Sequence, residues 1–336
     1  MTPKIAASLI VAGLATAGFT AVAWGQPAPA PSFVLPLACR IGQTCEIQHY
    51  LDRDPGPGVL DYRCGHRTYD KHNGIDIRLL DLRAEQGAGT AVLAAAAGKV
   101  SRLRDGAPDI SIRAPGAGSV VNKECGNGVV IDHGGGWETQ YCHLQKGSIG
   151  VAIGQPVAAG QAIAKAGLSG DTEFPHLHFT VRRAMKIVDP FAPDPAREGQ
   201  CGAAAGTLWS PATARDLAYK AGVVLNAGWA GRPIAAGDVE TGAIAAPTQA
   251  SPAVVAYFRL IGLAQGDVLD LSLVGPRGET LAKVSQPPLD HDKDQYFSMI
   301  GKKGAPGSWG KGAYRAEVRV IRGGAVALSR RIELNL

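Results

Sequence analysis

The stretch FPHLHFTV, residues 174–181, decides the fold and the site that we expect of this chain. Apart from its two histidines it is typical of a buried strand, where Val or Ile would pack better. Side chains two residues apart on a β-strand point from the same face of the sheet. His176 and His178 are therefore expected to address one point in space, although such a pair also occurs as ordinary hydrogen-bonded histidines on a sheet face.

A second cluster, KHNGIDIRL at residues 71–79, favours a shared site over ordinary hydrogen-bonded histidines. His72 and Asp76 lie four apart, an even spacing that leaves both on one face if the segment enters a strand. Gly74 between them permits a tight or twisted backbone beside a site. Histidine and aspartate both bind zinc, and three protein ligands leave a fourth position for water or substrate. His72, Asp76 and one histidine of the pair would supply that number.

The rest of this region indicates an all-β fold. The chain has 336 residues with 44 glycines and 22 prolines, which favours many turns and short strands. Their alternation and short loops suggest an antiparallel sheet. We expect one domain over residues 37–191. Its strand-like segments are 90–104, 128–134, 137–144, 161–167 and 176–183.

The C-terminal part has a different composition. After a Pro-rich linker at 192–215, residues 216–336 contain about seven short strand-like segments, which predicts a β-sandwich of immunoglobulin-like size. His291 stands here in LDHDKD, which we interpret as a solvated acidic loop rather than a metal site. No aromatic cluster in this part indicates a ligand.

The N-terminus predicts export. Residues 1–25 have one early cation, Lys4, followed by an apolar stretch, as in a cleaved signal peptide, and residues 26–36 form a Pro/Ala linker. No stable membrane span is then expected after cleavage, and an uncleaved anchor is the alternative. The formal net charge is only +5, without a run of five or more like charges, so nucleic acid is not an expected partner.

An even number of cysteines in an exported chain indicates disulfides. Cys125 and Cys142 flank a hairpin that folds about residues 134–136, which brings them within bridging distance. No pair has C-x-x-C spacing, so a zinc ribbon is not indicated. The pairing of the others stays open: Cys39, Cys45, Cys64 and Cys201.

Four motifs in this order, HNGID, GNGVVIDHGGGWETQYCHL, VAIGQPVAAGQAIAKAGLSG and FPHLHFTV, resemble the lysostaphin-type or β-lytic zinc metallopeptidases, the LytM-like peptidoglycan endopeptidases. The resemblance covers roughly residues 70–191. It implies a strongly twisted antiparallel sheet with a groove across one face, where the metal sits.

The resemblance also implies residue roles. His72, Asp76 and His178 would bind Zn²⁺, and His143 and His176 would be the catalytic histidines beside it. One of these two would take a proton from water and the other would stabilise the oxyanion, in an order that the sequence leaves open. The implied protein is a periplasmic or secreted zinc metalloendopeptidase that hydrolyses stem peptides or cross-links of peptidoglycan, its expected partner.

Three alternatives stay open. The domain could be a non-catalytic LytM-like scaffold that regulates other cell-wall hydrolases. The Cys-rich segment 39–70 could cover the groove, and His66 within it could approach the metal. The C-terminal part could be mainly an envelope-binding or partner-binding module.

Overall fold

The computed structural model describes residues 1–2, 29–84, 89–116, 118–194, 200–202 and 206–336. The predicted signal peptide, 1–25, therefore lies outside the described residues except at its first two positions. None of the helices in the described part of the chain has the length and apolar character needed to cross a bilayer.

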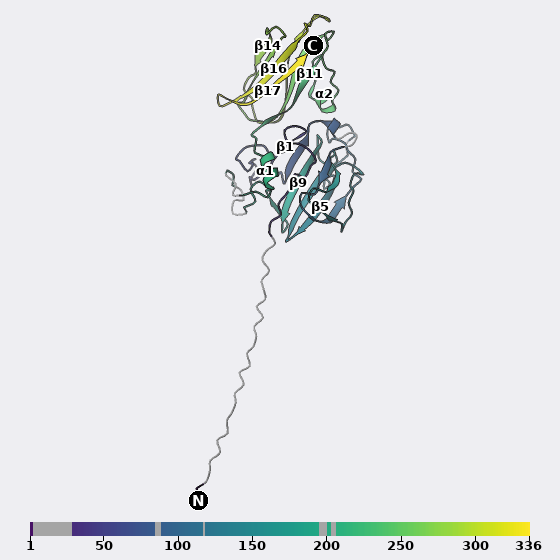
Figure 1. The fold of residues 1–336 in the computed structure, drawn as a ribbon, viewed down its shortest axis with the longest axis vertical. Coiled ribbons are helices and arrows are strands. Elements are labelled where there is room, and N and C mark those ends of the chain that lie inside the picture. The colour runs from purple at the N-terminus through teal and green to yellow at the C-terminus, as the bar shows by residue number, and fades with distance from the viewer. Residues whose placement is uncertain (3–28, 85–88, 117, 195–199, 203–205) are drawn as a thin grey trace.

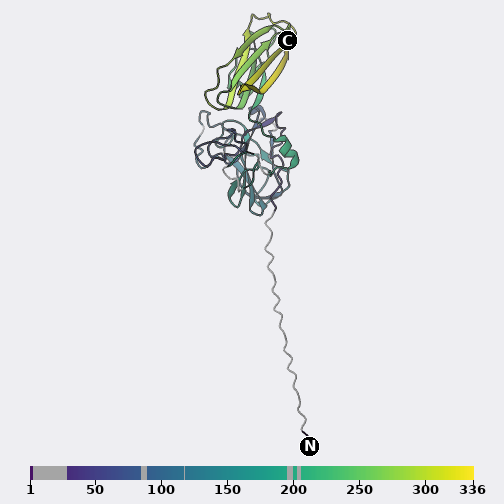
Figure 2. The same cartoon turned by 90° about the vertical axis from the view of Figure 1, so that its left-hand side faces the viewer.

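Strands dominate both halves of the chain, which confirms the all-β fold. Figure 1 shows two compact parts stacked along the long axis, one with β1, β5 and β9 and the other with β11, β14, β16 and β17; Figure 2 shows the same division from the side. Helices in the described residues are short: η1 (Leu82–Ala84), α1 (Pro211–Asp216) and α2 (Ala236–Thr241).

The first part is built on one antiparallel sheet. Its strands, in pairing order, are β1 (Cys45–His49), β2 (Ile75–Leu79), β9 (His176–Arg183), β6 (Trp137–Leu144), β5 (Asn127–Gly134), β4 (Gly98–Arg104) and β7 (Pro156–Val157), with β10 (Lys186–Val188) against β9. β3 (Ala91–Leu93) pairs separately with β8 (Ala162–Lys165). The segment predicted as one strand, 90–104, thus divides into β3 and β4.

Alternation along β9 separates a core face from a polar face. Leu177, Phe179 and Val181 are at most 1% exposed and belong to the first hydrophobic core. His176 and His178 take the alternate positions of the strand, so they lie on the other face. Within the predicted linker 192–215, the chain packs on this same core through buried residues such as Trp209, immediately before α1.

The second part consists of two antiparallel sheets around a separate core, which we call the C-terminal sandwich. One sheet contains β11 (Val223–Ala230), β12 (Ala253–Leu263) and β15 (Lys293–Lys303). The other contains β14 (Thr280–Ser285), β13 (Val268–Val274), β16 (Ala313–Arg322) and β17 (Ala325–Asn335). Buried side chains of both sheets, including Phe258, Leu271 and Val318, share one core. The immunoglobulin-like class and the domain limits stay predictions.

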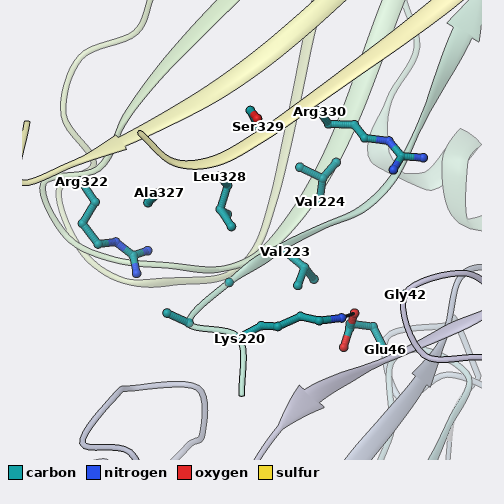
Figure 3. A pocket seen from close by; sticks show the side chains of 12 residues that line it. Gly42, Glu46, Lys220, Val223, Val224, Arg322, Ala327, Leu328, Ser329 and Arg330 are labelled. Carbon is teal, nitrogen blue, oxygen red and sulfur yellow. Dashed lines mark hydrogen bonds and ion pairs between the residues drawn. The ribbon is translucent and has the colours of Figure 1, made fainter. Parts of the chain in front are cut away.

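Polar contacts join the two parts. Figure 3 shows the ammonium of Lys220 beside the carboxylate of Glu46, 2.6 Å away, at the edge of a 430 Å³ pocket between β1 and the C-terminal sandwich. Nearby, His66 Nδ1 lies 2.6 Å from the carboxylate of Asp292. The junction therefore includes β1 and the Cys-rich segment around it.

Three disulfides are present, and one is the pair that the hairpin predicts. Cys125 and Cys142 are bonded, with Cα atoms 4.8 Å apart. The two pairings left open by the sequence are Cys39 with Cys45 and Cys64 with Cys201. The last of these joins the Cys-rich segment to the end of the first part.

Candidate metal centre

Three predicted ligand residues meet on the polar face of β2 and β9. Asp76 and His178 are opposite each other in the pairing of these strands, and His72 precedes β2 by three residues. Asp76 Oδ1 lies 2.9 Å from His178 Nδ1 and 3.2 Å from His72 Nε2. The two histidine nitrogens are 3.2 Å apart.

Gly74 makes this approach possible. A Cβ atom at this position would lie 2.6 Å from the Phe179 carbonyl oxygen and 2.8 Å from His178 Nε2. Any larger residue would therefore push β9 or the His178 ring away. The glycine is needed here for close packing rather than for the tight or twisted backbone that the sequence suggested, because its φ lies outside the left-handed region.

The second polar atom of each ligand residue is already engaged. His72 Nδ1 donates to the Tyr50 carbonyl oxygen at 2.6 Å, because a carbonyl can only accept. His178 Nε2 donates to Asn73 Oδ1 at 3.0 Å. The other carboxylate oxygen of Asp76, Oδ2, accepts from His49 Nδ1 at 2.9 Å. Such outer partners fix the tautomer and orientation of metal ligands.

These hydrogen bonds leave three acceptor atoms facing one another. When both rings are neutral, His72 Nε2, His178 Nδ1 and Asp76 Oδ1 have lone pairs and no proton to share, within 3.2 Å. Neutral packing cannot stabilise that arrangement, whereas a cation can. Zinc ligands at about 2.1 Å from a tetrahedral centre lie about 3.4 Å apart, close to the observed spacing. The residues present therefore fit zinc.

Two of these groups have pKa values shifted from their ordinary values. Burial opposes ionisation of Asp76, but His72 and His176 outweigh it and hold the pKa of this carboxyl well below its ordinary value. Burial lowers the pKa of His178, although Asp76 partly offsets this. An ionised carboxylate and neutral imidazoles are the forms in which these groups bind a metal.

Two further histidines border the ligand cluster. The ring centres of His143 and His176 are 4.5 Å apart, and His143 lies 5.9 Å from the His178 ring. His143 Nδ1 donates to the Ser169 carbonyl oxygen at 2.8 Å, and His176 Nδ1 to that of Phe174 at 3.0 Å. Both rings therefore keep Nε2 as their second functional atom.

His143 reaches this face through an unusual backbone. In β6 the residue opposite His178 is Cys142, so simple alternation would turn His143 to the core face. Its φ of 61° lies in the left-handed region, where a non-glycine residue is uncommon. Burial is the main cause that holds the pKa of the His143 ring well below its ordinary value, and the neighbouring rings of His176 and His178 lower it further.

His49 is the site residue that our sequence analysis missed. It pairs with Asp76 across β1 and β2, next to an irregularity in the register, and is 7% exposed. Burial lowers its pKa, but the carboxylates of Asp294 and Asp76 together raise it above the ordinary value. The Cys-rich segment thus contributes a partner of a ligand residue.

The other histidines lie elsewhere. The alternative that His66 approaches the metal is wrong, because His66 is exposed and pairs with Asp292. His133 contacts the Ala97 carbonyl oxygen away from the cluster. Within the described residues, the group of side chains able to hold a metal is His72, Asp76 and His178, and His291 is outside it.

Comparison with known proteins agrees with this arrangement. Residues 70–190 match the model of Peptidase family M23. This segment is an M23 peptidase domain. The match confirms the LytM-like resemblance of the four motifs, and the M23 domain contains all five histidine and aspartate residues predicted for the site.

Named relatives resemble the M23 domain over part of their length. Cell division protein DipM of Caulobacter vibrioides is 33% identical over 118 residues, 35% of this chain and 16% of that protein. Peptidoglycan DD-endopeptidase ShyB of Vibrio cholerae is 44% identical over 77 residues, 22% of this chain and 18% of that protein. This chain therefore spans less than a fifth of either relative.

Among solved structures, the M23 domain is similar to a zinc-containing peptidase from Vibrio cholerae. The sequence identity is 28%, the alignment covers 42% of this chain and 38% of that chain, and the TM-score is 0.27.

Proposed function

We propose that this protein is an exported zinc metalloendopeptidase that hydrolyses peptide bonds of peptidoglycan, in its stem peptides or cross-links. The crowding of three acceptor atoms, on the buried residues His72 and Asp76 and the partly buried His178, is the observation that carries the proposal. The M23 match and the endopeptidase name of ShyB support the reaction class.

His72, Asp76 and His178 would hold the zinc ion. When bound, zinc supplies a Lewis acid and lowers the pKa of a coordinated water towards neutrality. His143 and His176 each present Nε2 beside the cluster, with Nδ1 held by a carbonyl oxygen. One ring accepts the proton of the attacking water at Nε2, and the other donates a hydrogen bond to the oxyanion once it carries a second proton, on Nε2, as an imidazolium.

The proposed location is the periplasm or the cell envelope. Disulfides persist in oxidising compartments, and all six cysteines are paired: Cys39 with Cys45, Cys64 with Cys201 and Cys125 with Cys142. Together with the predicted signal peptide at 1–25, this supports export to where peptidoglycan lies.

Digestion of purified sacculi tests the proposal. The mature full chain, loaded with zinc, is compared with His178→Ala and with the control variant His291→Ala, whose ring is exposed and outside the cluster. Mass spectrometry of the released muropeptides should find new peptide termini with wild type and control but not with His178→Ala. No release by the wild type, combined with stimulation of an added amidase, would instead support a scaffold.

A further inference from the structure

The C-terminal sandwich contacts the first part of the structure on β1 and β2, the strands that carry His49 and Asp76. In Figure 1, α2 lies at the end of the sandwich that faces the first part, where it contacts η1. Two acidic residues of the sandwich approach β1 and β2 themselves. They are Glu240 on α2 and Asp294 on β15.

Glu240 joins two buried guanidinium groups. Its Oε2 accepts from Arg78 Nη2 at 2.9 Å and also from Arg259 Nη1 of β12. The Arg78 side chain is fully buried, and that of Arg259 is 3% exposed. Removing the carboxylate charge would leave two neighbouring buried cations, which is strongly unfavourable. The position of Arg78 therefore depends on the sandwich.

Arg78 in turn fixes a residue that orients His176. Arg78 is opposite His176 in the β2–β9 pairing, and its guanidinium lies over the Phe174 ring, 3.9 Å from the ring centre. The carbonyl oxygen of Phe174 accepts the hydrogen bond from His176 Nδ1. A shift of Arg78 would release Phe174 and change where His176 Nε2 points.

Asp294 makes the second link, to Asp76. Its carbonyl oxygen accepts from Gln48 Nε2 at 2.9 Å, and its Oδ1 lies 3.7 Å from His49 Nε2. His49 Nδ1 donates to Asp76 Oδ2. Gln48 Oε1 also accepts from Arg78, so the two links meet at one buried glutamine.

We propose that the C-terminal sandwich is a positioning element of the metal centre, which acts on His176 through Glu240 and on Asp76 through Asp294. The inference rests on the proposed function of the M23 domain. It gives the sandwich a role that does not require a ligand of its own. Glu240 and Asp294 are positioning residues, because neither touches the ligand cluster.

The test uses point variants of the full chain. Glu240→Gln removes one charge with little change of shape, and Asp294→Ala removes an exposed carboxylate. Their matched controls are Glu333→Gln and Asp290→Ala, two exposed acids whose ion pairs stay within the sandwich. Zinc affinity is measured by competition with a chromophoric chelator, kcat and KM on a cross-linked muropeptide, and folding by thermal unfolding.

We expect Glu240→Gln to lower kcat about 10-fold with KM nearly unchanged, because misorientation of a catalytic group acts on the chemical step. Asp294→Ala should weaken zinc binding by up to about 10-fold, the lower range for residues outside the ligands. Both controls should match the wild type in kcat and zinc affinity.

Variants that fold, bind zinc and turn over like their controls would overturn the inference. A Glu240→Gln variant with a lower unfolding temperature but an unchanged kcat at 25 °C would also overturn the inference. A contact that serves only the stability of the fold predicts that result. An inactive wild type would contradict the proposed function instead, and the zinc affinity of Asp294→Ala would still decide the inference.

Discussion

The exchange His49→Ala gives the most direct test of the outer hydrogen bonds at the metal centre. It removes the 2.9 Å bond from His49 Nδ1 to Asp76 Oδ2, in a place where Asp76 is only 3% exposed. Asp76 Oδ2, the carboxylate oxygen that points away from the cluster, then loses its hydrogen-bond donor. The carboxylate can rotate, and Oδ1 is no longer held towards His72 and His178.

Two independent estimates of the loss agree. A hydrogen bond to a charged group contributes about 1.5–3 kcal/mol. Removing an outer partner of a metal ligand weakens metal affinity by about 10- to 100-fold, which is about 1.4–2.7 kcal/mol. We therefore expect the zinc dissociation constant of His49→Ala to rise by about 10- to 100-fold. A water molecule that fills the space left by the imidazole could donate to Asp76 Oδ2, and the rise of the dissociation constant would then be near 10-fold.

The measurement is competition for zinc between the metal-free full chain and a chromophoric chelator at fixed pH. His66→Ala is the matched control, because it removes a histidine of the same segment whose side chain is 57% exposed and does not contact the cluster. A folded His49→Ala variant that binds zinc within two-fold of wild type and control would refute the role assigned to His49.

Three further outcomes follow from the structure. Gly74→Ala should abolish zinc binding, measured by metal analysis, because its Cβ would lie 2.6 Å from the Phe179 carbonyl oxygen and 2.8 Å from His178 Nε2; normal zinc content would contradict this. Replacing Cys125 and Cys142 by serine should lower the free energy of unfolding by about 3 kcal/mol, because the disulfide closes a loop of 17 residues. Urea titration measures this change. An unchanged midpoint would show that closing the loop does not stabilise the protein. A chelator should lower the unfolding temperature and stop muropeptide release, and added zinc should restore both, since a ligand that binds only the folded state stabilises it.

Period-2 alternation predicted part of the site well. Asp76, His176 and His178 lie on one face because they occupy even positions of two paired strands. The same rule fails at His143, where a φ of 61° turns the side chain to the polar face. Only the family resemblance placed His143 beside the cluster, because backbone conformation of this kind leaves no mark on the pattern of apolar residues.

Long-range pairing explains what the sequence did not predict. His49 reaches Asp76 because β1 pairs with β2 across an irregular register, and nothing in EIQHY indicates which strand it joins. His66 in the same segment faces the sandwich instead, where it contacts Asp292. The pairing of Cys64 with Cys201, 137 residues apart, is hidden in the same way. A hairpin disulfide such as Cys125 with Cys142 is predictable because its geometry is local.

The pairing of β2 with β9 also determines when the chain can acquire metal. His178 is 102 residues from Asp76 and 106 from His72, so a long loop must close before the three ligands meet. An unfolded chain offers scattered donors rather than a site. The compartment in which β9 joins β2 therefore decides which divalent ion is available to the proposed metal centre.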